Sequence, residues 1–392
     1  MNNKPNILVV TTLYPNSVQF RHGIFVETRV KHLNETGKFN IKIIAPIPWF
    51  PFKLKYFPIY SKLIDIPNCE LREGIEVYHP RYIVIPKVGM WLTPFFLGFC
   101  ILSQIKKLKK QEDYSFDFID AHYYYPDGVA AALIASWLNK PLAITARGTD
   151  INLIPNFTLP RKMILWASKV ARFNLAVSSA LRNKMLEIGV DESTIHVLRN
   201  GVDLKLFAPL NRDFLRKKWQ INSKLLISVG NLIELKGHHL VIGALELLPD
   251  YQLFVVGGGE WEENLKIKAQ NSGVHDRVKF LGEVLQQQLT ELYNCADALV
   301  LASSREGWPN VLLEAMACGL PVIATNVGAC SDMIKAPEAG VLCLERSSKG
   351  IAFAVNKLFA NYPDRKKTRL FAEGFSWDET TAYQVRLFSD IQ

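Results

Sequence analysis

The chain has 392 residues, a length that suits two domains of similar size better than one core. Hydrophobic residues make up 49% of it and charged residues 21%, which excludes the polar excess of a disordered chain. The net charge of +9 and a pI near 9.1 indicate an anionic partner: a nucleotide, a nucleic acid or a membrane surface. Because the sequence contains no RNA-binding motif, zinc finger or aromatic-glycine repeat, nucleic acid ranks last.

The cysteines and the N-terminal residues indicate a cellular compartment. The six cysteines form no C-x-x-C pair and have no close histidine, so we expect buried thiols in a reducing environment. The first apolar run, Ile7 to Val10, reaches Tyr14 without a small-residue cleavage site, and no secretion signal is expected. A cytoplasmic location follows as an expectation.

Short apolar runs alternate with amphipathic stretches, which is typical of β-α-β units and a parallel sheet. In the first half the runs lie at 7–10, 41–45, 118–121, 142–145, 175–178 and 196–198. The pattern restarts after Gly201, with runs at 225–229, 253–256, 278–281, 298–301, 322–324 and 340–342. The sequence therefore predicts an α/β protein made of two Rossmann-like, doubly wound domains.

The domain boundary is predicted at the Asn-Gly turn of residues 200–203, which a polar stretch follows. The first domain is then 1–203 and the second 204–374. In the end segment, 375–392, Ser376 is placed to cap a terminal helix, which we expect to return to the first domain.

Two segments raise the question of a membrane. Residues 88–105 are almost continuously apolar and precede four lysines, but Thr93 and Pro94 look like the N-cap and first position of a helix. The remaining apolar stretch, 95–105, is too short to cross a bilayer, so we expect a core or interfacial helix. The segment 47–63 alternates aromatic residues with prolines and lysines, and it either lies on anionic lipid or packs over the first core.

The strongest local signal runs from Ser303 to Pro321. A strand is predicted to end before it, and Pro309 is predicted to begin a helix that stops at Gly319. Free backbone N–H groups then lie at the positive end of the helix dipole, those of Asn310, Val311 and Leu312. We expect this helix start to hold a diphosphate.

Two carboxylates lie close to that helix start in the sequence, and a lysine follows an earlier strand. Glu306 lies in the loop before the helix and Glu314 in its second turn, so the two carboxylates are spaced to hold hydroxyl groups beside a diphosphate. Taken alone this spacing is weak evidence, since a turn glutamate and a solvated helix glutamate would look the same. Lys236 follows the strand that ends at Val229, where it either neutralises a departing phosphate or is simply solvated.

Other residues follow strands without a firm assignment. Gly257 to Gly259 let the backbone approach a ligand, but Glu262 stands where a dinucleotide fingerprint needs its third glycine, which weakens an oxidoreductase interpretation. In the first domain Arg147 either grips phosphate or forms a salt bridge with Asp150. His122 ends another strand, and a lone histidine is more often structural than catalytic.

Near the start of the chain, Gly23 connects the first strand to a helix and would let a diphosphate approach that helix start. Each of these signals is modest. Their common position at the carboxyl ends of strands carries the argument, because ligands bind at that edge of open α/β sheets.

The residues together resemble glycosyltransferase family 4, the retaining enzymes of GT-B fold. The resemblance covers essentially the whole chain through YPN, HGIFVE, AHYYYPDG, TARGTD, NGVD, VGN, LKG, VGGGE and above all EGWPNVLLEAMACGLPVIAT. The PDG and ARGTD segments further resemble bacterial enzymes of teichuronic-acid, capsule or lipopolysaccharide assembly. The resemblance implies two domains facing a cleft, a UDP- or GDP-sugar donor and a saccharide or lipid-linked saccharide acceptor. The implied location is either the cytoplasm or the cytoplasmic face of the plasma membrane, bound peripherally.

The resemblance also implies roles in the second domain. Glu306 would contact the hydroxyls of the donor sugar, Glu314 would hold the ribose, and Lys236 would stabilise the leaving diphosphate. Backbone near Gly282 and Val284 would meet the base.

By the same resemblance His122 would meet the transferred sugar and Gly23 would lie over the phosphates. The sequence departs from the family at two positions. Many relatives have arginine where this chain has Asn231, which would shift part of the diphosphate contact onto Arg147, and relatives often have histidine where Arg147 stands.

The implied mechanism is front-face retention, in which the leaving diphosphate accepts the proton of the acceptor hydroxyl. His122 would either stabilise positive charge or orient the sugar as the oxocarbenium-like state forms. The chain has no D-x-D sequence, so we expect neither a divalent metal nor another cofactor. Two other functions stay open: a sugar-nucleotide epimerase on the same plan, and a non-catalytic binder of sugar nucleotides or lipid surfaces.

Overall fold

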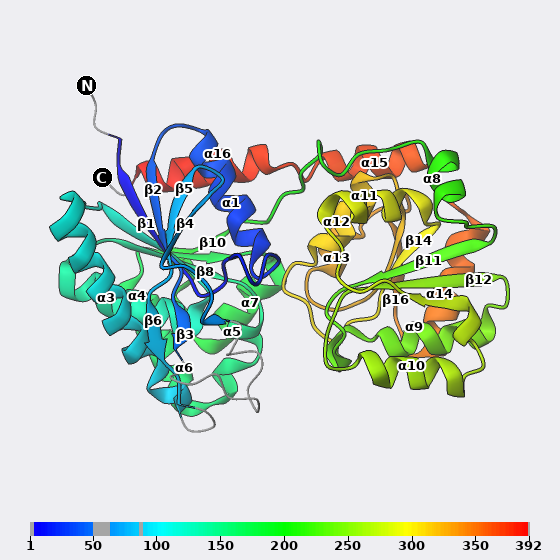
Figure 1. Cartoon of the computed structure of the whole chain (residues 1–392), viewed down its shortest axis with the longest axis horizontal. Helices are drawn as coiled ribbons and strands as arrows, with labels where there is room; N and C mark the ends of the chain where they lie inside the picture. Colours follow the sequence, from blue (N-terminus) through cyan, green and yellow to red (C-terminus); the bar gives the residue numbers. More distant parts are fainter. Residues whose placement is uncertain (1–3, 50–62, 86–88, 391–392) are drawn as a thin grey trace. The chain divides into compact units, whose positions relative to one another are not determined.

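The computed structural model describes residues 4–49, 63–85 and 89–390 (Figure 1). It consists of two units: unit 1 comprises Met1–Arg199 with Thr380–Gln392, and unit 2 comprises Asn200–Glu379. The predicted boundaries lay after residues 203 and 374. The difference arises because the Asn-Gly turn belongs to unit 2, where the amide of Val202 donates to the carbonyl of Phe375 at 2.9 Å.

Unit 1 contains an eight-stranded sheet in the order β10-β9-β8-β7-β1-β2-β5-β4. The strands pair in parallel except for β4 with β5 at the edge. Their bounds are β1 (Asn6–Val10), β2 (Asn40–Ile44), β4 (Cys69–Arg72), β5 (Ile75–Tyr78), β7 (Phe118–His122), β8 (Leu142–Ala146), β9 (Phe173–Ala176) and β10 (Ile195–Val197). A separate pair joins β3 (Ile47–Trp49) to β6 (Arg81–Ile83).

Helices cover both faces of this sheet (Figure 1). Alternate residues of β1 point to opposite faces, and Ile7 and Val9 share one core cluster with α1 and α16. The rings of Phe118 and Phe388 lie 4.8 Å apart, so the C-terminal helix packs on the core of unit 1. The helices are α1 (Ile24–Glu35), α3 (Thr93–Glu112), α4 (Val129–Leu138), α5 (Thr149–Asn152), α6 (Thr158–Val170), α7 (Ser179–Ile188) and α16 (Trp377–Ser389).

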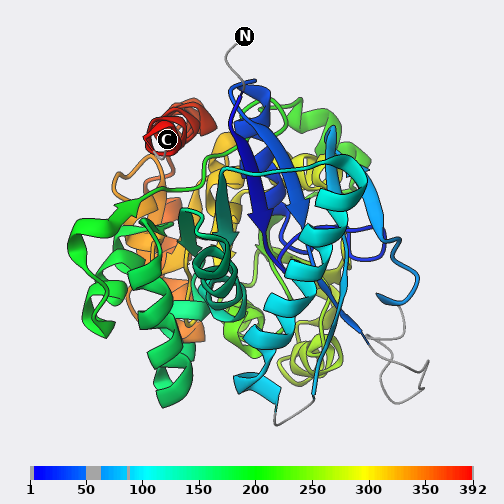
Figure 2. The same ribbon diagram turned by 90° about the vertical axis from the view of Figure 1, so that its left-hand side faces the viewer.

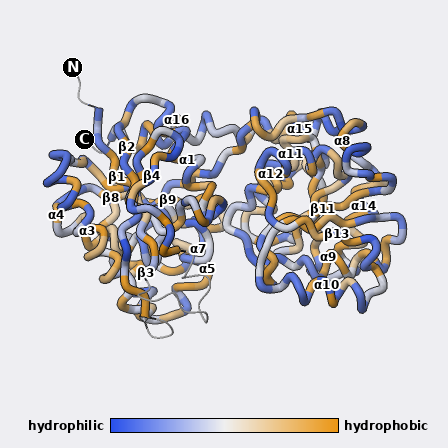
Figure 3. Tube along the Cα trace, viewed as in Figure 1, coloured by the Kyte–Doolittle hydropathy of each residue, from blue (hydrophilic) through white to orange (hydrophobic). Residues whose placement is uncertain are grey.

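Unit 2 contains a six-stranded, all-parallel sheet in the order β13-β12-β11-β14-β15-β16. Figure 3 shows hydrophobic residues gathered in the strands of this unit. The strands are β11 (Lys224–Val229), β12 (Tyr251–Val256), β13 (Val278–Phe280), β14 (Ala298–Leu301), β15 (Val322–Thr325) and β16 (Gly340–Cys343). The helices are α8 (Arg212–Lys218), α9 (His238–Ala244), α10 (Glu262–Asn271), α11 (Gln286–Cys295), α12 (Asn310–Ala317), α13 (Cys330–Met333), α14 (Ser348–Ala360) and α15 (Arg365–Glu373).

The two sheets confirm the predicted pair of doubly wound α/β domains, and each of the twelve predicted strands is present within a few residues. The strands β3, β4, β5 and β6 were not predicted. In β4 exposed and partly exposed residues alternate, because it forms the antiparallel edge and has no apolar run. For the same reason the prediction of buried thiols is wrong for Cys69, which is exposed on β4.

The segment that raised the membrane question folds as the start of helix α3. Thr93 is its first residue rather than its N-cap, and the Thr93 hydroxyl donates to the carbonyl of Gly89 at 2.8 Å. In the described part of the chain, no helix is long and apolar enough to cross a bilayer. Most of the other candidate, residues 47–63, lies outside the described residues; Trp49 is exposed on β3 and Leu63 is buried.

Candidate functional site

The carboxyl edge of the unit 2 sheet brings Lys236 and Glu306 together. The chain passes from β11 to β12 and β13 on one side and returns to β14, β15 and β16 on the other, so β11 and β14 flank the switch point of the sheet. Loops after two such strands diverge and leave a crevice in which ligands bind. Lys236 follows β11 and Glu306 follows β14.

The ammonium Nζ of Lys236 lies 2.7 Å from Oε1 of Glu306, and the same oxygen accepts the hydroxyl of Ser303 at 2.6 Å. The two charged side chains are 23% and 9% exposed. A solvated lysine and an ordinary turn glutamate would be far more exposed. The structure therefore contradicts the alternatives in which Lys236 is simply solvated and Glu306 is an ordinary turn residue. It places a cation and a carboxylate in one partly buried ion pair.

Two glycines let the loops after β11 and β15 pass close to the loop after β14. Gly237, which follows Lys236, has φ of +70°, and a Cβ there would lie 2.1 Å from the carbonyl oxygen of Ala302. Gly328, with φ of +53°, passes so close to Glu306 that a Cβ would lie 1.9 Å from the Glu306 carbonyl oxygen. The β11 and β15 loops therefore hold the β14 loop by main-chain contact.

The helix start beside Glu306 offers fewer amides than predicted. Helix α12 begins at Asn310, and Pro309 is its N-cap without a side-chain cap. The amide of Leu312 donates to the carbonyl of Pro309 at 3.0 Å, so the prediction that it is free is wrong. Among the described residues, no acceptor is found for the amides of Asn310 and Val311. Those two N–H groups are left at the positive end of the helix.

Glu314 is held in the second turn of α12. The hydroxyl of Tyr293, a fully buried residue of α11, donates to Oε2 of Glu314 at 3.1 Å. The Glu314 side chain is therefore held by a hydrogen bond, whereas the alternative from the sequence was a solvated helix glutamate. Its predicted contact with the ribose stays a prediction.

Three other predicted residues also follow strands at this edge. The Asn231 side chain is exposed, and its carbonyl accepts the amide of Ile233 at 2.9 Å. Gly282 has φ of +66° and accepts the amide of Gly257 at 2.8 Å, while Val284 is buried. A Cβ at Gly282 would meet nothing within 4 Å, and contact of this loop with a nucleotide base stays a prediction.

In unit 1, His122 ends β7 and is fully buried. A guanidinium nitrogen of Arg147 lies 2.7 Å from its Nδ1, and Oδ2 of Asp120 lies 3.4 Å from its Nε2. Burial lowers the pKa of His122 to about 4, so the ring is neutral at pH 7. Because the guanidinium can only donate, Nδ1 accepts and the ring proton is on Nε2. As it lies, the ring offers no exposed nitrogen to a sugar.

Arg147 is half-buried and turned toward this histidine. Its guanidinium lies 5.2 Å from the ring centre of Phe25, and burial lowers its pKa. The Asp150 carboxylate accepts the Arg147 amide at 3.1 and 3.2 Å, and it also accepts the amides of Tyr124 and Gly148 at 2.7 Å each. The Asp150 carboxylate thus binds main-chain amides of the loops after β7 and β8. Phosphate binding by Arg147 stays a prediction.

Gly23 is the N-cap of α1, with φ of +71°. A Cβ there would lie 2.2 Å from the carbonyl oxygen of Leu13, so only glycine fits where the loop after β1 meets the helix. The geometry agrees with a close main-chain approach, and the predicted place of the phosphates over Gly23 stays a prediction.

The sequence analysis missed the role of Asp127. This buried carboxylate follows β7 and accepts the amide and the hydroxyl of Thr12, which follows β1, at 2.5 and 3.0 Å. Burial raises the pKa of Asp127 to about 7. The pair joins the two strands that flank the switch point of the unit 1 sheet. The signal was the PDG motif, whose aspartate follows a predicted strand.

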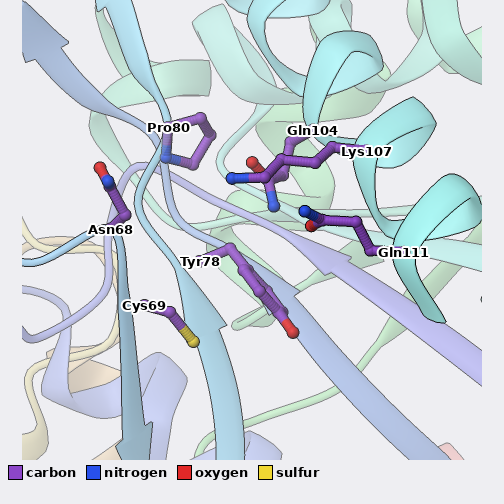
Figure 4. Close-up of a pocket in the computed structure, with 7 residues that line it drawn as sticks. All are labelled: Asn68, Cys69, Tyr78, Pro80, Gln104, Lys107 and Gln111. Atoms are coloured by element: carbon purple, nitrogen blue, oxygen red, sulfur yellow. The ribbon is translucent and has the colours of Figure 1, made fainter.

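A cavity of about 190 Å³ lies in unit 1 between the β4–β5 edge and α3 (Figure 4). Its lining includes the carboxamides of Asn68, Gln104 and Gln111, the ammonium of Lys107 and the ring of Tyr78. No residue predicted from the sequence lines it. Within the described ranges, no three His, Cys, Asp or Glu side chains gather as a possible metal site.

Known proteins resemble this chain along its whole length. The family described as "Glycosyl transferases group 1" matches residues 211–373, and "Glycosyltransferase Family 4" matches residues 40–206. The "Putative teichuronic acid biosynthesis glycosyltransferase TuaC" of Bacillus subtilis is 30% identical over 90% of this chain and 88% of its own length. An N-acetyl-alpha-D-glucosaminyl L-malate synthase of Bacillus anthracis is 28% identical over 64% of this chain and 67% of its own.

Solved structures share the fold. A sucrose-phosphate synthase of Thermosynechococcus elongatus superimposes with a TM-score of 0.82 at 19% identity, covering 99% of both chains. The HepE protein of Anabaena, solved in complex with UDP and glucose, gives a TM-score of 0.76 at 18% identity over 99% of this chain and 100% of its own. With the two Rossmann-like sheets and the family matches, this chain belongs to glycosyltransferase family 4 and is a glycosyltransferase of GT-B fold.

Proposed function

We propose that the enzyme transfers a sugar from a UDP- or GDP-sugar to a saccharide or lipid-linked saccharide, with retention of anomeric configuration, in the synthesis of a cell-surface polysaccharide. The observation that carries the proposal is the Lys236–Glu306 pair beside the α12 start. The biosynthetic context is supported by the relative named for teichuronic acid biosynthesis, and the donor class by the fold neighbour solved with UDP.

The donor diphosphate would lie at the start of α12. The amides of Asn310 and Val311 would donate to it, and the Lys236 ammonium would leave Glu306 to contact a phosphate oxygen. Glu306, released from the lysine but still bonded to Ser303, would then accept hydroxyls of the donor sugar. The ion pair is thus a resting arrangement that the donor opens.

In the transfer step the bond from the anomeric carbon to the diphosphate oxygen breaks, and a bond from the acceptor oxygen to that carbon forms on the same face. The acceptor proton passes to the departing phosphate oxygen, so no side-chain base is required. Lys236 and the two amides offset the charge that develops on the diphosphate. This chemistry uses the chain's own cation, and activity is proposed to be independent of divalent metal and of any other cofactor.

His122 can contact the transferred sugar only if its surroundings rearrange. Since its Nδ1 accepts from Arg147 and the ring is buried, stabilising the oxocarbenium-like state would require the loop after β7 to move. The main stabilisation of the departing diphosphate would therefore come from residues of unit 2.

Glu306→Ala tests the site. Turnover of a donor with a mixture of saccharide acceptors should fall by about 10²- to 10³-fold, while the thermal midpoint changes little. Wild-type turnover in this variant would reject the site. Proton NMR of the product decides the stereochemistry, because an inverted anomer would contradict retention.

A sugar-nucleotide epimerase is the alternative enzyme. It would convert the donor without any acceptor, whereas a transferase needs the acceptor for its main product. Analysis of products formed from the donor alone separates the two.

A further inference from the structure

Three neighbouring helices of unit 1 share an unusual outer surface. Helix α3 contacts α4, and α4 contacts α6, so the three lie side by side (Figure 2). Residues on their inner sides, among them Leu97, Ile134 and Ile164, are buried inside the unit. Their outer sides carry aromatic rings and basic groups together, and we call this surface the docking face.

Along α3 the exposed positions form one stripe at helical spacing. Phe95 and Phe99 lie in its first half, and Lys106 and Lys110 continue the same side in its second half. Phe99 is 60% exposed. The stripe thus changes from aromatic to basic along one helix.

Helix α4 extends the aromatic part. The Trp137 ring lies 5.8 Å from the Phe99 ring and is 49% exposed. Two large rings therefore form one continuous apolar area across two helices, although water would favour burying each of them.

Helix α6 repeats the mixture on its own outer side. Leu159, Lys162, Trp166 and Lys169 follow one another at intervals of three or four residues, and all four are exposed. The helix has no acidic residue. Apolar and basic side chains thus alternate along this side of α6.

The charge of the docking face is strongly one-sided. The three helices carry seven basic residues, four in α3 and three in α6, and one acidic residue, Glu112. Glu112 bonds to Lys42 and Tyr78, so it does not neutralise the docking face. Among the described residues no salt bridge is found for Lys106, Lys110, Lys162 or Lys169.

We propose that the docking face binds the surface of an anionic lipid bilayer, with Phe99, Trp137 and Trp166 at headgroup depth and the lysines on lipid phosphates. Aromatic rings beside lysine on the outer side of a helix are typical of interfacial binding. Lysine is depleted in the cores of protein interfaces, which argues for lipid over a protein partner. The binding needs neither donor nor acceptor, so it stands or falls independently of the proposed function.

The test is sedimentation of the full chain with vesicles of phosphatidylglycerol and phosphatidylcholine, and with phosphatidylcholine alone, in the absence of sugar nucleotide. The wild type should bind the anionic vesicles, and high salt should weaken the binding because the lysine contribution is screened. Phe99→Ser with Trp137→Ser, and separately Lys106→Gln with Lys110→Gln, should each lower the partition coefficient by about tenfold or more.

The matched control is Phe353→Ser with Lys357→Gln, which removes an exposed ring and an exposed lysine from one side of α14 in unit 2. It should bind like the wild type. A single Trp166→Gln variant gives a second measurement if the double aromatic variant fails to fold. Absence of binding to anionic vesicles, equal binding by the docking-face variants, or equal loss in the α14 control would overturn the proposal.

Discussion

Lys236 and Glu306 come from the loops after two neighbouring strands, β11 and β14, and their charged atoms lie 2.7 Å apart. The pair lies at the carboxyl edge of the sheet, and Glu306 precedes the start of α12, where two amides have no protein acceptor in the described chain. An ammonium beside such amides is suited to a diphosphate, whose charge both can offset.

Lys236→Met keeps the aliphatic stem, which lies near Gly230, and removes the charge. We expect turnover to fall by about 10²-fold or more, because the diphosphate leaves without its cation. Stability should change by less than about 2 kcal/mol, as for a partly exposed ion pair. Lys266→Met is the control, since it removes the ammonium of an exposed pair with Glu263 on α10 and should leave turnover unchanged.

Gly328→Ala should impair catalysis through the main chain. The new Cβ would meet the carbonyl oxygen of Glu306 at 1.9 Å, so the β14 loop must shift. Gly273→Ala is a matched control, because Gly273 has a similar φ of +64° and nothing within 4 Å of its Cβ position. Both variants should lose about 1 kcal/mol for the left-handed conformation. Equal turnover in the two variants would show that the contact with Glu306 does not matter.

His122 should make stability depend on pH. Burial lowers its folded-state pKa to about 4 from 6.5, so the stability linked to it is full above 6.5 and is lost as pH falls from 6.5 toward 4. The loss amounts to about 3 kcal/mol at most. Denaturant unfolding of the wild type and His122→Gln at several pH values measures it. Parallel curves for the two proteins would contradict a buried neutral ring.

Asp127 should show the opposite dependence. Its pKa is raised from 3.8 to about 7, so the stability linked to it is full below 3.8 and is lost as pH rises through about 7. Asp127→Asn keeps an acceptor for the Thr12 amide and cannot ionise. The variant should therefore gain stability relative to the wild type between pH 4 and 7. A constant difference over that range would refute the raised pKa.

The sequence predicts the parts of this fold that bury apolar runs. Ile7 to Val10 and Leu225 to Val229 lie inside parallel sheets, where continuous apolar character is required. It does not predict β4, whose polar residues lie at an edge. Residues that follow parallel strands can likewise be placed at one edge of the sheet. On this basis Lys236 and Glu306 were predicted as site residues.

The hydrogen-bond partners of the site residues could not be predicted from the sequence. The Leu312 amide is taken by the Pro309 carbonyl because the helix starts with a tight turn, and nothing in the residue types signals this. The burial of His122 against Arg147 likewise depends on two strands meeting in register. Such contacts arise from packing and not from local pattern.

In the proposed function, unit 2 holds a nucleoside diphosphate through Lys236. The most direct test is a thermal-shift titration of the wild type and Lys236→Met with UDP-, GDP- and ADP-sugars, since a ligand that binds only the folded state raises the melting temperature. We predict that a UDP- or GDP-sugar stabilises the wild type and that Lys236→Met binds it about tenfold more weakly or worse. Equal affinity in the two proteins, or no shift with any of the sugars, would rule out a diphosphate site at Lys236.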